Sequence, residues 1–476
     1  MITLSTNRTK ILATIGPATS SVSLLKKLIL SGADGVRFNM SHGDYEFFEK
    51  VFDNIHEACT EEKSPLAVLV DLQGPKIRIG ELEKDEIEIR SGETIELTTE
   101  EIRGNEKVIS TNYSQLIDDA EIGKHILIND GLIRLIIKEK KKNSLICLIE
   151  EGGILTPRKG LNLPGLKLST PSITEKDFSD LEFVLKHRVD YIALSFVRSA
   201  NDILKLKDWL KEREHSTPVI AKIEKKEAVD DLNSIIEAAD GIMIARGDLG
   251  VELSPQDVPV IQKDIIKRCN EVGKLVITAT QMLESMIHSQ MPTRAEASDV
   301  ANAVWDGTDV VMLSGETSIG DFPFETVKVM SEIICKAEEH HLATKNIIYE
   351  IPENFEENIF DSGCRGISII ANQVKAKAIV AFTFKGRAAK GIAKYRPESQ
   401  IIAISNDFNT MNNLCLRWGV KSLYMEKIEK EHVAIDEAKK LILEAGLVKK
   451  DDIVIFVSRA PHTEKSRTDW LRFEVM

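Results

Sequence analysis

The chain has 476 residues, 43% of them hydrophobic and 29% charged, with a formal net charge of −13. This length predicts two or three domains, and the composition excludes an intrinsically disordered chain. The acidic balance argues against non-specific nucleic-acid binding, and no run approaches the roughly 20 apolar residues of a membrane span. Six widely spaced cysteines without a Cys-x-x-Cys pair indicate reduced thiols. Because the N-terminus also lacks a signal peptide's apolar core, we expect a cytoplasmic protein.

Short apolar runs separated by helix-like stretches recur in two parts of the chain, three before residue 75 and five after residue 170. They are Ile11–Ile15, Gly35–Met40, Leu66–Leu72, Tyr191–Val197, Val219–Glu224, Gly241–Ala245, Leu275–Thr280 and Val310–Leu313. Strands that are each followed by a helix, in this number, predict a closed (β/α)8 TIM barrel. In such a barrel the active site forms at the carboxyl ends of the strands.

Residues 75–170 break this rhythm and predict a small β-barrel domain inserted after strand three. Segments such as Glu86–Ile89 and Leu132–Ile137 alternate apolar and polar residues or are β-branched, and Asn129–Gly131 is a turn sequence. The run Lys138–Asn143 is typical of a solvated hairpin tip rather than a nucleic-acid contact.

A third region follows a linker-like stretch near residue 350. Its predicted strands are Ala378–Thr383, Ile401–Ser405, Lys421–Tyr424 and Ile453–Val457, and its predicted helices are Arg365–Lys375, Arg387–Tyr395 and Ile435–Ala445. This pattern indicates an α/β domain with a mainly parallel sheet. We therefore expect a catalytic barrel from residues 1–74 and 171–345, an inserted β domain at 75–170 and a C-terminal domain at 346–476. Neither a Gly-x-x-x-x-Gly-Lys phosphate loop nor a Gly-x-Gly-x-x-Gly fingerprint is present.

Charged residues at the ends of two of the predicted barrel strands form a candidate catalytic and metal-binding site. Lys222 and Glu224 are two residues apart and therefore emerge on the same face, and Asp248 follows the next strand. Two carboxylates suit Mg²⁺, and an adjacent ammonium suits a phosphoryl group or an enolate. The alternative is a salt bridge inside the barrel that binds no substrate.

Further polar residues fall on the same end of the barrel. Arg37, Asn39 and Ser41 are spaced by two along the second strand, and Asp71 ends the third. An arginine fork suits phosphate, and the oxygens of the other side chains suit a cation. Thr278 and Thr280 end the seventh strand with hydroxyls expected on one face. Such a threonine can equally cap a helix, and His42 can equally be an ordinary turn residue.

The chain resembles the pyruvate kinase family over nearly its whole length. The matching segments are Thr9–Ile11, Thr14–Ala18, Arg37–Gly43, Asp71–Arg78, Lys159–Gly165, Ala221–Glu224, Ala245–Gly250, Ala279–Met286 and Pro292–Glu296. Ordered motifs in this number and at this spacing are specific to the family.

The resemblance implies phosphoryl transfer from phosphoenolpyruvate to ADP, giving pyruvate and ATP, which is the last step of glycolysis. It assigns Glu224 and Asp248 to Mg²⁺ (or Mn²⁺), Lys222 and Arg37 to the phosphoryl group, and Gly247, Asp248 and Thr280 to the rest of the substrate. It assigns Asn39, His42, Arg78 and Lys159 to ADP or ATP, with Lys159 arriving from the inserted domain. A homotetramer without nucleic-acid or membrane partners is also implied.

One departure from the family pattern concerns K⁺. Many members bind this ion with positions equivalent to Asn39, Ser41, Asp71 and the carbonyl of Leu72, next to a glutamate. Lys76 takes the place of that glutamate, and this resembles the branch of the family that works without K⁺. A tethered ammonium can supply the missing charge, so we expect no K⁺ requirement. The alternative is that Lys76 is an ordinary solvated loop lysine.

A second departure lies in the two C-terminal loops that hold effectors in the family. Thr383–Ala388 lacks hydroxyls after its first residue, and Ser458–Ser466 lacks glycines. The sequence therefore does not identify which effector binds, or whether one binds at all. Two other function classes also stay open. A pyruvate-forming carbon–carbon lyase has a similar metal triad without the inserted domain or the Arg37 strand. A non-catalytic effector-binding homologue would show losses at Lys222, Glu224 or Asp248, and all three are present.

Overall fold

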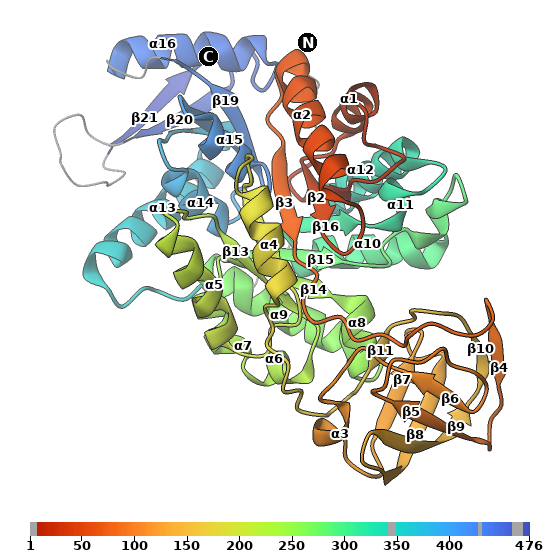
Figure 1. Cartoon of the computed structure of the whole chain (residues 1–476). Helices are drawn as coiled ribbons and strands as arrows, with labels where there is room; N and C mark the ends of the chain where they lie inside the picture. The colour runs from red at the N-terminus through yellow and green to blue at the C-terminus, as the bar shows by residue number, and fades with distance from the viewer. Residues whose placement is uncertain (1–6, 341–348, 427–430, 459–469) are drawn as a thin grey trace.

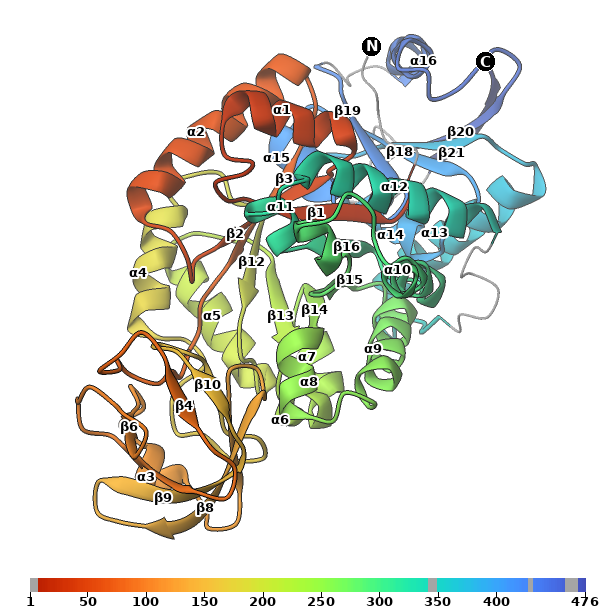
Figure 2. The ribbon, with the colours of Figure 1, turned by 90° about the vertical axis from the view of Figure 1, so that its right-hand side faces the viewer.

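A computed structural model describes residues 7–340, 349–426, 431–458 and 470–476 of the chain. A central barrel has a small β domain at one end and an α/β domain at the other, and the two views of Figure 1 and Figure 2 agree on this arrangement. The predicted fold class is confirmed.

The barrel is a closed, parallel sheet in the order β1-β16-β15-β14-β13-β12-β3-β2. Its strands are β1 (Lys10–Thr14), β2 (Gly35–Asn39), β3 (Ala67–Asp71), β12 (Tyr191–Leu194), β13 (Val219–Ile223), β14 (Gly241–Ala245), β15 (Leu275–Ala279) and β16 (Val310–Leu313). Every predicted barrel strand is present, and the ends differ by at most a few residues. β1 begins one residue earlier and β3 one residue later than predicted, and the other differences fall at the carboxyl ends, where polar side chains leave the ladder to form the site.

The helices around the barrel follow from apolar spacing. In α2 (Tyr45–Glu62) the buried residues Phe48, Val51, Phe52 and Ile55 recur every three or four positions, and Asp44 caps the first turn by accepting the Phe47 N–H. The other long helices are α1 (Val22–Ser31), α4 (Glu175–Val184), α5 (Ala200–Glu212), α9 (Val258–Val272), α10 (Arg294–Asp306) and α12 (Pro323–His340). Shorter ones are α6 (Lys226–Asp230), α7 (Leu232–Ala238), α8 (Arg246–Glu252), η1 (Glu284–Ile287) and α11 (Gly315–Ser318).

The inserted β domain has a hydrophobic core of its own, separate from that of the barrel. Its six-stranded sheet has the order β11-β7-β8-β9-β5-β6, and β10 pairs with β4 beside it. The strands are β4 (Ile87–Ile89), β5 (Thr94–Thr98), β6 (Val108–Ser110), β7 (His125–Ile128), β8 (Ile133–Lys140), β9 (Ser144–Glu151), β10 (Gly153–Leu155) and β11 (Leu161–Asn162), with the short helix α3 (Leu116–Asp119). The predicted hairpin tip lies between β8 and β9 and is exposed.

The C-terminal sheet has the order β19-β18-β17-β20-β21. Its strands are β17 (Ala378–Phe382), β18 (Gln400–Ser405), β19 (Val420–Tyr424), β20 (Ile453–Ser458) and β21 (Trp470–Val475), and its helices are α13 (Phe355–Gln373), α14 (Arg387–Lys394), α15 (Phe408–Leu414) and α16 (Glu431–Glu444). The first four strands are parallel as predicted, while β21 is an unpredicted antiparallel edge strand. The expected start of α13 at Arg365 is wrong, because Asn354 caps a polar first turn ten residues earlier.

The C-terminal domain closes the amino-terminal end of the barrel. Cys415 and Leu416 belong to the same buried cluster as the interior-facing barrel residues Leu12, Leu69 and Ile220. The hydroxyl of Tyr191, at the start of β12, donates to the carbonyl of Asn413 at 2.6 Å. The barrel interior is therefore completed by side chains from the other domain.

Gly241, at the start of β14, tests the packing of this interior. A Cβ there would lie 2.8 Å from Ile220 Cδ1 and 2.9 Å from the Leu275 carbonyl oxygen. Because backbone cannot shift cheaply, we expect Gly241→Ala to lower the free energy of unfolding by about 1–3 kcal/mol in urea titrations. In Gly363→Ala, on helix α13, the new Cβ meets nothing within 4 Å, so stability should hold or rise. Equal effects of the two changes would contradict this account.

Candidate active site

Lys222 is the centre of a buried ionic network at the carboxyl end of β13. Its ammonium lies 2.9 Å from Glu224 Oε1 and 3.1 Å from Asp71 Oδ1, and it donates to Ser195 Oγ at 2.7 Å. Strand alternation puts Lys222 and Glu224 on the interior face, as the sequence predicted for this pair. β3, β12 and β13 thus direct polar groups to one point.

The network fixes the charges of its members. Burial alone would lower the pKa of Lys222, but the Asp71 and Glu224 carboxylates raise it above its usual value. Burial would likewise raise the pKa of Asp71, yet Lys222 and Arg37 lower it overall. Lys222 is therefore an ammonium and Asp71 a carboxylate at neutral pH.

Asp71 also positions Arg37. Asp71 Oδ2 accepts from Arg37 Nε at 2.8 Å and from Nη2 at 2.6 Å, while Arg37 Nη1 donates to Thr14 Oγ1 at 3.1 Å. Arg37 is 9% exposed, so it is held rigidly at the mouth of the barrel. Two fixed cations, Arg37 and Lys222, thus share one carboxylate.

Glu224 and Asp248 fit the donor set of a hard divalent cation. Glu224 Oε2 accepts the Phe196 N–H at 2.7 Å, whereas buried Oε1 forms an ion pair with Lys222 at 2.9 Å and has no hydrogen-bond partner among the described residues. Burial and then the Glu224 charge raise the pKa of Asp248 to about 6. Two neighbouring carboxylates repel each other, and a cation that both of them bind removes this repulsion. No cluster of three or more His, Cys, Asp or Glu ligands occurs in the described residues.

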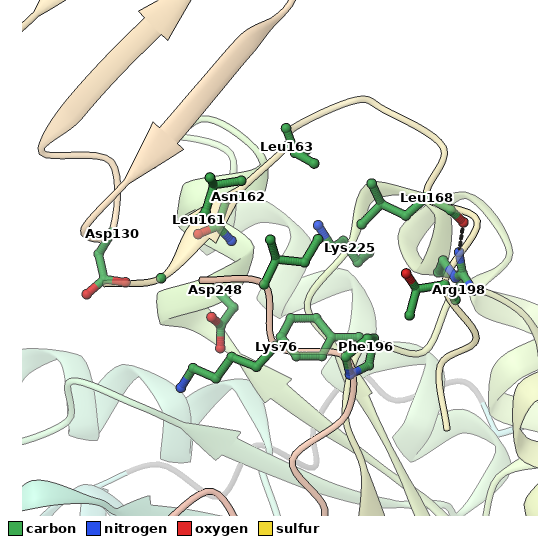
Figure 3. Close-up of a pocket in the computed structure, with 14 residues that line it drawn as sticks. Lys76, Asp130, Leu161, Asn162, Leu163, Leu168, Phe196, Arg198, Lys225 and Asp248 are labelled. Carbon is green, nitrogen blue, oxygen red and sulfur yellow. Dashed lines mark hydrogen bonds between the residues drawn. The ribbon is translucent and has the colours of Figure 1, made fainter. Parts of the chain in front are cut away.

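Two cavities meet at Asp248 between the barrel and the inserted domain. Figure 3 shows the first, of about 90 Å³, which the inserted domain lines with Asp130 and Gly160–Leu163 and the barrel with Phe196, Lys225 and Asp248. The second, of about 580 Å³, extends along Arg246–Asp248, Gln281 and Asp299. Substrates could therefore be enclosed by surfaces of the two domains.

Gly247 and Thr280 face each other at this cleft. α8 begins beside Gly247, whose N–H donates to Thr280 Oγ1 at 2.9 Å. The Thr280 backbone has a φ of +68°, which turns the chain so that strand alternation does not extend to its side chain. The Thr278 hydroxyl has a different partner, Thr308 Oγ1 at 3.0 Å. The expectation of a same-face hydroxyl pair therefore fails.

The residues assigned to the nucleotide are spread over both domains. Asn39 Oδ1 accepts the Ser41 N–H at 3.2 Å. Arg78 Nη1 donates to the Arg158 carbonyl at 2.8 Å, and the half-buried Lys159 accepts the Ile79 N–H through its carbonyl. Lys159 does not line either cavity.

The pKa of His42 is lowered, first by loss of hydration and then by Lys76 and Arg78. Several cations therefore surround this side of the cleft, and a neutral His42 is favoured at pH 7.

Lys76 is half-buried and belongs to the lining of the smaller cavity, where Figure 3 shows it near Asp248. Its pKa is lowered, first by burial and then by Arg78, and its principal oppositely charged neighbours are Asp248 and Asp130. Asp71 is instead paired with Arg37 and Lys222, and the Leu72 carbonyl accepts the Ser195 hydroxyl at 2.7 Å. Oxygens expected at a K⁺ site are thus occupied by internal donors.

Polar residues that the sequence did not single out attach the inserted domain. Arg198 donates to the carbonyls of Leu168 and Thr170 at 2.5 and 2.7 Å. Glu252 pairs with the buried Lys225 at 2.8 Å and accepts the Gly165 N–H at 3.3 Å. Ser195 lies within the predicted strand Tyr191–Val197 and Arg198 directly follows it, so strand-end position could have indicated both. Glu252 carries no comparable signal, because its partners, the Lys225 ammonium and the Gly165 N–H, are distant in sequence.

The predicted effector loops are only partly described. Thr383 is buried, Lys385 is exposed, and the Arg387 guanidinium lies 4.3 Å from the ring centroid of Phe360. Residues 459–466 of the second loop lie outside the described residues. In the segments that the structure describes, no helix is both long and apolar enough to cross a bilayer.

A (β/α)8 barrel with metal-suited carboxylates and fixed cations under an inserted domain defines a barrel enzyme that acts on anionic substrates. The family model "Pyruvate kinase, barrel domain" matches residues 6–327, and "Pyruvate kinase, alpha/beta domain" matches residues 361–473. The pyruvate kinase of Geobacillus stearothermophilus is 40% identical over 98% of this chain and 80% of its own length. That of Staphylococcus epidermidis is 39% identical over the same shares.

A crystal structure of a pyruvate kinase from Cryptosporidium parvum superposes with a TM-score of 0.92, at 38% identity, over 98% of this chain and 96% of the other. The chain belongs to the pyruvate kinase family.

The Arg198 contacts predict how firmly the inserted domain is held. Arg198→Met removes two charge-assisted bonds, each of about 1.5–3 kcal/mol. We expect amide hydrogen exchange in residues 166–172 to accelerate at least roughly tenfold, with barrel-strand amides unchanged. The matched change Arg90→Met, at a surface arginine paired only with exposed Glu88, should leave this segment's exchange unaltered. Unchanged exchange in Arg198→Met would show that other contacts fix the attachment.

Proposed function

We propose that the Lys222 network and the adjoining cleft carry out the family's reaction. Family membership makes the chain a phosphotransferase of class EC 2.7.1.40, which transfers the phosphoryl group of phosphoenolpyruvate to ADP and gives pyruvate and ATP. It also separates the chain from the carbon–carbon lyases considered above. The observation that carries the site assignment is the convergence of Lys222, Arg37, Glu224 and Asp248 at one strand edge.

In this proposal, fixed cations receive the phosphoryl group. Arg37, held by Asp71 and Thr14, presents a guanidinium to the phosphate, and Lys222 stabilises the group in flight. A loose transition state carries charge on its equatorial oxygens, so positioned cations lower its energy more than covalent catalysis does. Lys222 need only turn its ammonium from Asp71 and Glu224 toward the incoming oxygens.

Glu224 and Asp248 would hold the divalent ion, Mg²⁺ or Mn²⁺, which supplies positive charge to the substrate oxygens when bound. Glu224 Oε1, which has no hydrogen-bond donor among the described residues beyond its ion pair with Lys222, and the raised pKa of Asp248 support this assignment. The backbone N–H groups of Gly247 and Asp248, in the first turn of α8, would receive the carboxylate end of the substrate. Thr280 lies beside them and would orient this end and the proton delivered to the enolate.

The inserted domain would act as a closing lid. We assign residues 75–170 to it, 1–74 and 171–345 to the catalytic barrel, and 346–476 to a C-terminal domain. Its separate core and its attachment at Gly165, Leu168 and Thr170 support movement as a unit. Closure would bring Lys159 to the nucleotide, which Asn39, His42 and Arg78 also contact, and would exclude water.

We further propose that K⁺ is not required, with Lys76 as the substitute charge. Its position beside Asp248 in the cavity supports this role. A cytoplasmic homotetramer completes the proposal, and the free cysteines Cys59, Cys147, Cys269, Cys335, Cys364 and Cys415 agree with a reducing compartment.

A coupled assay for pyruvate formed from phosphoenolpyruvate and ADP tests the function directly, and Lys222→Met is the informative variant. Methionine keeps the aliphatic stem but removes the charge, so turnover should fall by orders of magnitude while the fold survives. An inactive unmutated protein would instead indicate a non-catalytic homologue.

The metal assignment predicts large effects from neutral isosteres. Glu224→Gln and Asp248→Asn should each cost at least ~2–4 kcal/mol of transition-state stabilisation, or roughly 30-fold or more in kcat. The assay is run across a Mg²⁺ titration. Asp230→Asn, at an exposed carboxylate that pairs with Lys226 on α6, is the matched control and should behave as the unmutated enzyme. Near-normal kcat at low Mg²⁺ in either site variant would refute the assignment.

The Lys76 assignment predicts activity without K⁺. With Mg²⁺ present and ionic strength held by tetramethylammonium salts, adding ~0.1 M K⁺ should change kcat by less than about threefold. Lys76→Glu should lower activity without K⁺ and recover part of it when K⁺ is added. Strong K⁺ activation of the unmutated enzyme at constant ionic strength would show that Lys76 does not replace the ion.

A further inference from the structure

A second polar cavity lies at the opposite end of the barrel, where the C-terminal domain packs against it. The barrel lines it with Asn270, Lys274 and Asp309, and the C-terminal domain lines it with Lys390, Arg396 and Arg417. Its volume is about 20 Å³. Since a cavity of about 10–15 Å³ holds one water, this one accepts a small group but no sugar or base ring. The half-buried Lys274 and Lys390 place its mouth toward solvent.

Positive charge in this cavity exceeds negative charge. Arg396 is paired with Asp309 at 2.7 Å and also donates to Asn270 Oδ1 at 2.7 Å. Lys390 and Arg417 have no carboxylate within ion-pair distance among the described residues. Asp240 exerts a weaker attraction on Lys390.

The remaining nearby charges do not change this balance. Asp240 is already bound to Lys207 at 2.9 Å. Lys274 uses two of its three protons on the carbonyls of Glu237 and Ala239. Two cationic groups, Lys390 and Arg417, therefore remain uncompensated at the seam between the domains.

Several donors on the residues that line this cavity have no acceptor among the described residues. Arg396 Nη1 and Arg417 Nε are buried and have no hydrogen-bond partner in the part of the chain that the structure describes. Arg396 itself is only 6% exposed. The Lys390 ammonium makes no hydrogen bond to a described residue, and burial, followed by Arg417, lowers its pKa to about 7. Buried donors without acceptors are costly, as are half-buried cations without a counter-charge, and an anion would relieve all three groups together.

We propose that this cavity binds a small oxyanion of the phosphate class, which joins the barrel to the C-terminal domain. Guanidinium and ammonium donors on different sides match an acceptor with several oxygens. The third proton of Lys274 supplies a donor from the barrel, and Arg396, Arg417 and Lys390 supply donors from the other domain. A water molecule would satisfy one or two donors but would leave the two charges uncompensated.

Thermal unfolding in sodium phosphate, compared with sodium chloride at equal ionic strength, tests the site. Lys390→Met keeps the aliphatic stem and removes the charge, and Lys440→Met is the matched change at an exposed lysine of α16. We expect phosphate to raise the Tm of the unmutated protein and of Lys440→Met. In Lys390→Met the phosphate concentration for half of this effect should be at least tenfold higher. Phosphate bound in the active-site cleft would shift the Tm of all three proteins equally. A difference in the Tm shift between Lys390→Met and the other two proteins therefore reports on the cavity between the barrel and the C-terminal domain.

A second measurement keeps the test independent of stability. Trp418 lies against Arg396, with the guanidinium carbon 4.8 Å from its ring centroid. Phosphate should therefore change tryptophan emission in the unmutated protein, and Trp418→Phe should abolish this change while keeping the Tm shift. Arg417→Lys, which keeps the charge but removes Nε, should weaken phosphate binding and covers the case in which Lys390→Met fails to fold.

Two results would overturn the proposal. One is a phosphate response in Lys390→Met equal to that of the unmutated protein, which would place the bound anion elsewhere. The other is a Lys390-dependent shift of the same size in chloride, which would mean that any small anion, rather than an oxyanion, neutralises the cavity.

Discussion

The arrangement of the barrel mouth depends on one buried ammonium that two carboxylates share. Lys222 can be buried only because Asp71 and Glu224 compensate its charge, and Asp71 can be buried only because Arg37 also binds it. Each group is therefore fixed by its neighbours before any ligand arrives. In the proposed function, cations fixed in such a network would need little reorganisation when charge develops on a substrate.

The same network is incomplete on its cavity side. Glu224 Oε1 has no hydrogen-bond donor, and Asp248 carries a raised pKa beside it. The Asp71 carboxylate, at the end of β3, thus has its full set of partners within the protein. The Glu224 and Asp248 carboxylates, which lie nearer β14, do not. In the proposed function, this gradient separates a part of the site that holds its shape from a part that would accept ligands. A chain of net charge −13 can in this way hold a local group of cations at the barrel mouth.

Periodicity was enough to predict the barrel and the interior position of Lys222 and Glu224. Apolar runs mark buried parallel strands because both faces of such strands are covered. Periodicity failed where the local backbone departs from regular geometry, as at Thr280, and where a helix begins with polar residues, as at Asn354. The role of Glu252 could not be predicted, because only the tertiary fold brings the Lys225 ammonium and the Gly165 N–H to it, and the carbonyl partners of Arg198 are likewise set by the tertiary fold.

The position of Cys415 and Leu416 in the barrel interior has a consequence for how the protein unfolds. Cys415 and Leu416 complete the interior of the barrel. Separating the C-terminal domain would therefore expose the core at the amino-terminal end of the barrel to water. Barrel and C-terminal domain should therefore melt as one cooperative unit, while the inserted domain, with its own core, can open separately. In evolution, the inserted domain could be exchanged or lost without destroying the barrel, but the C-terminal domain could not.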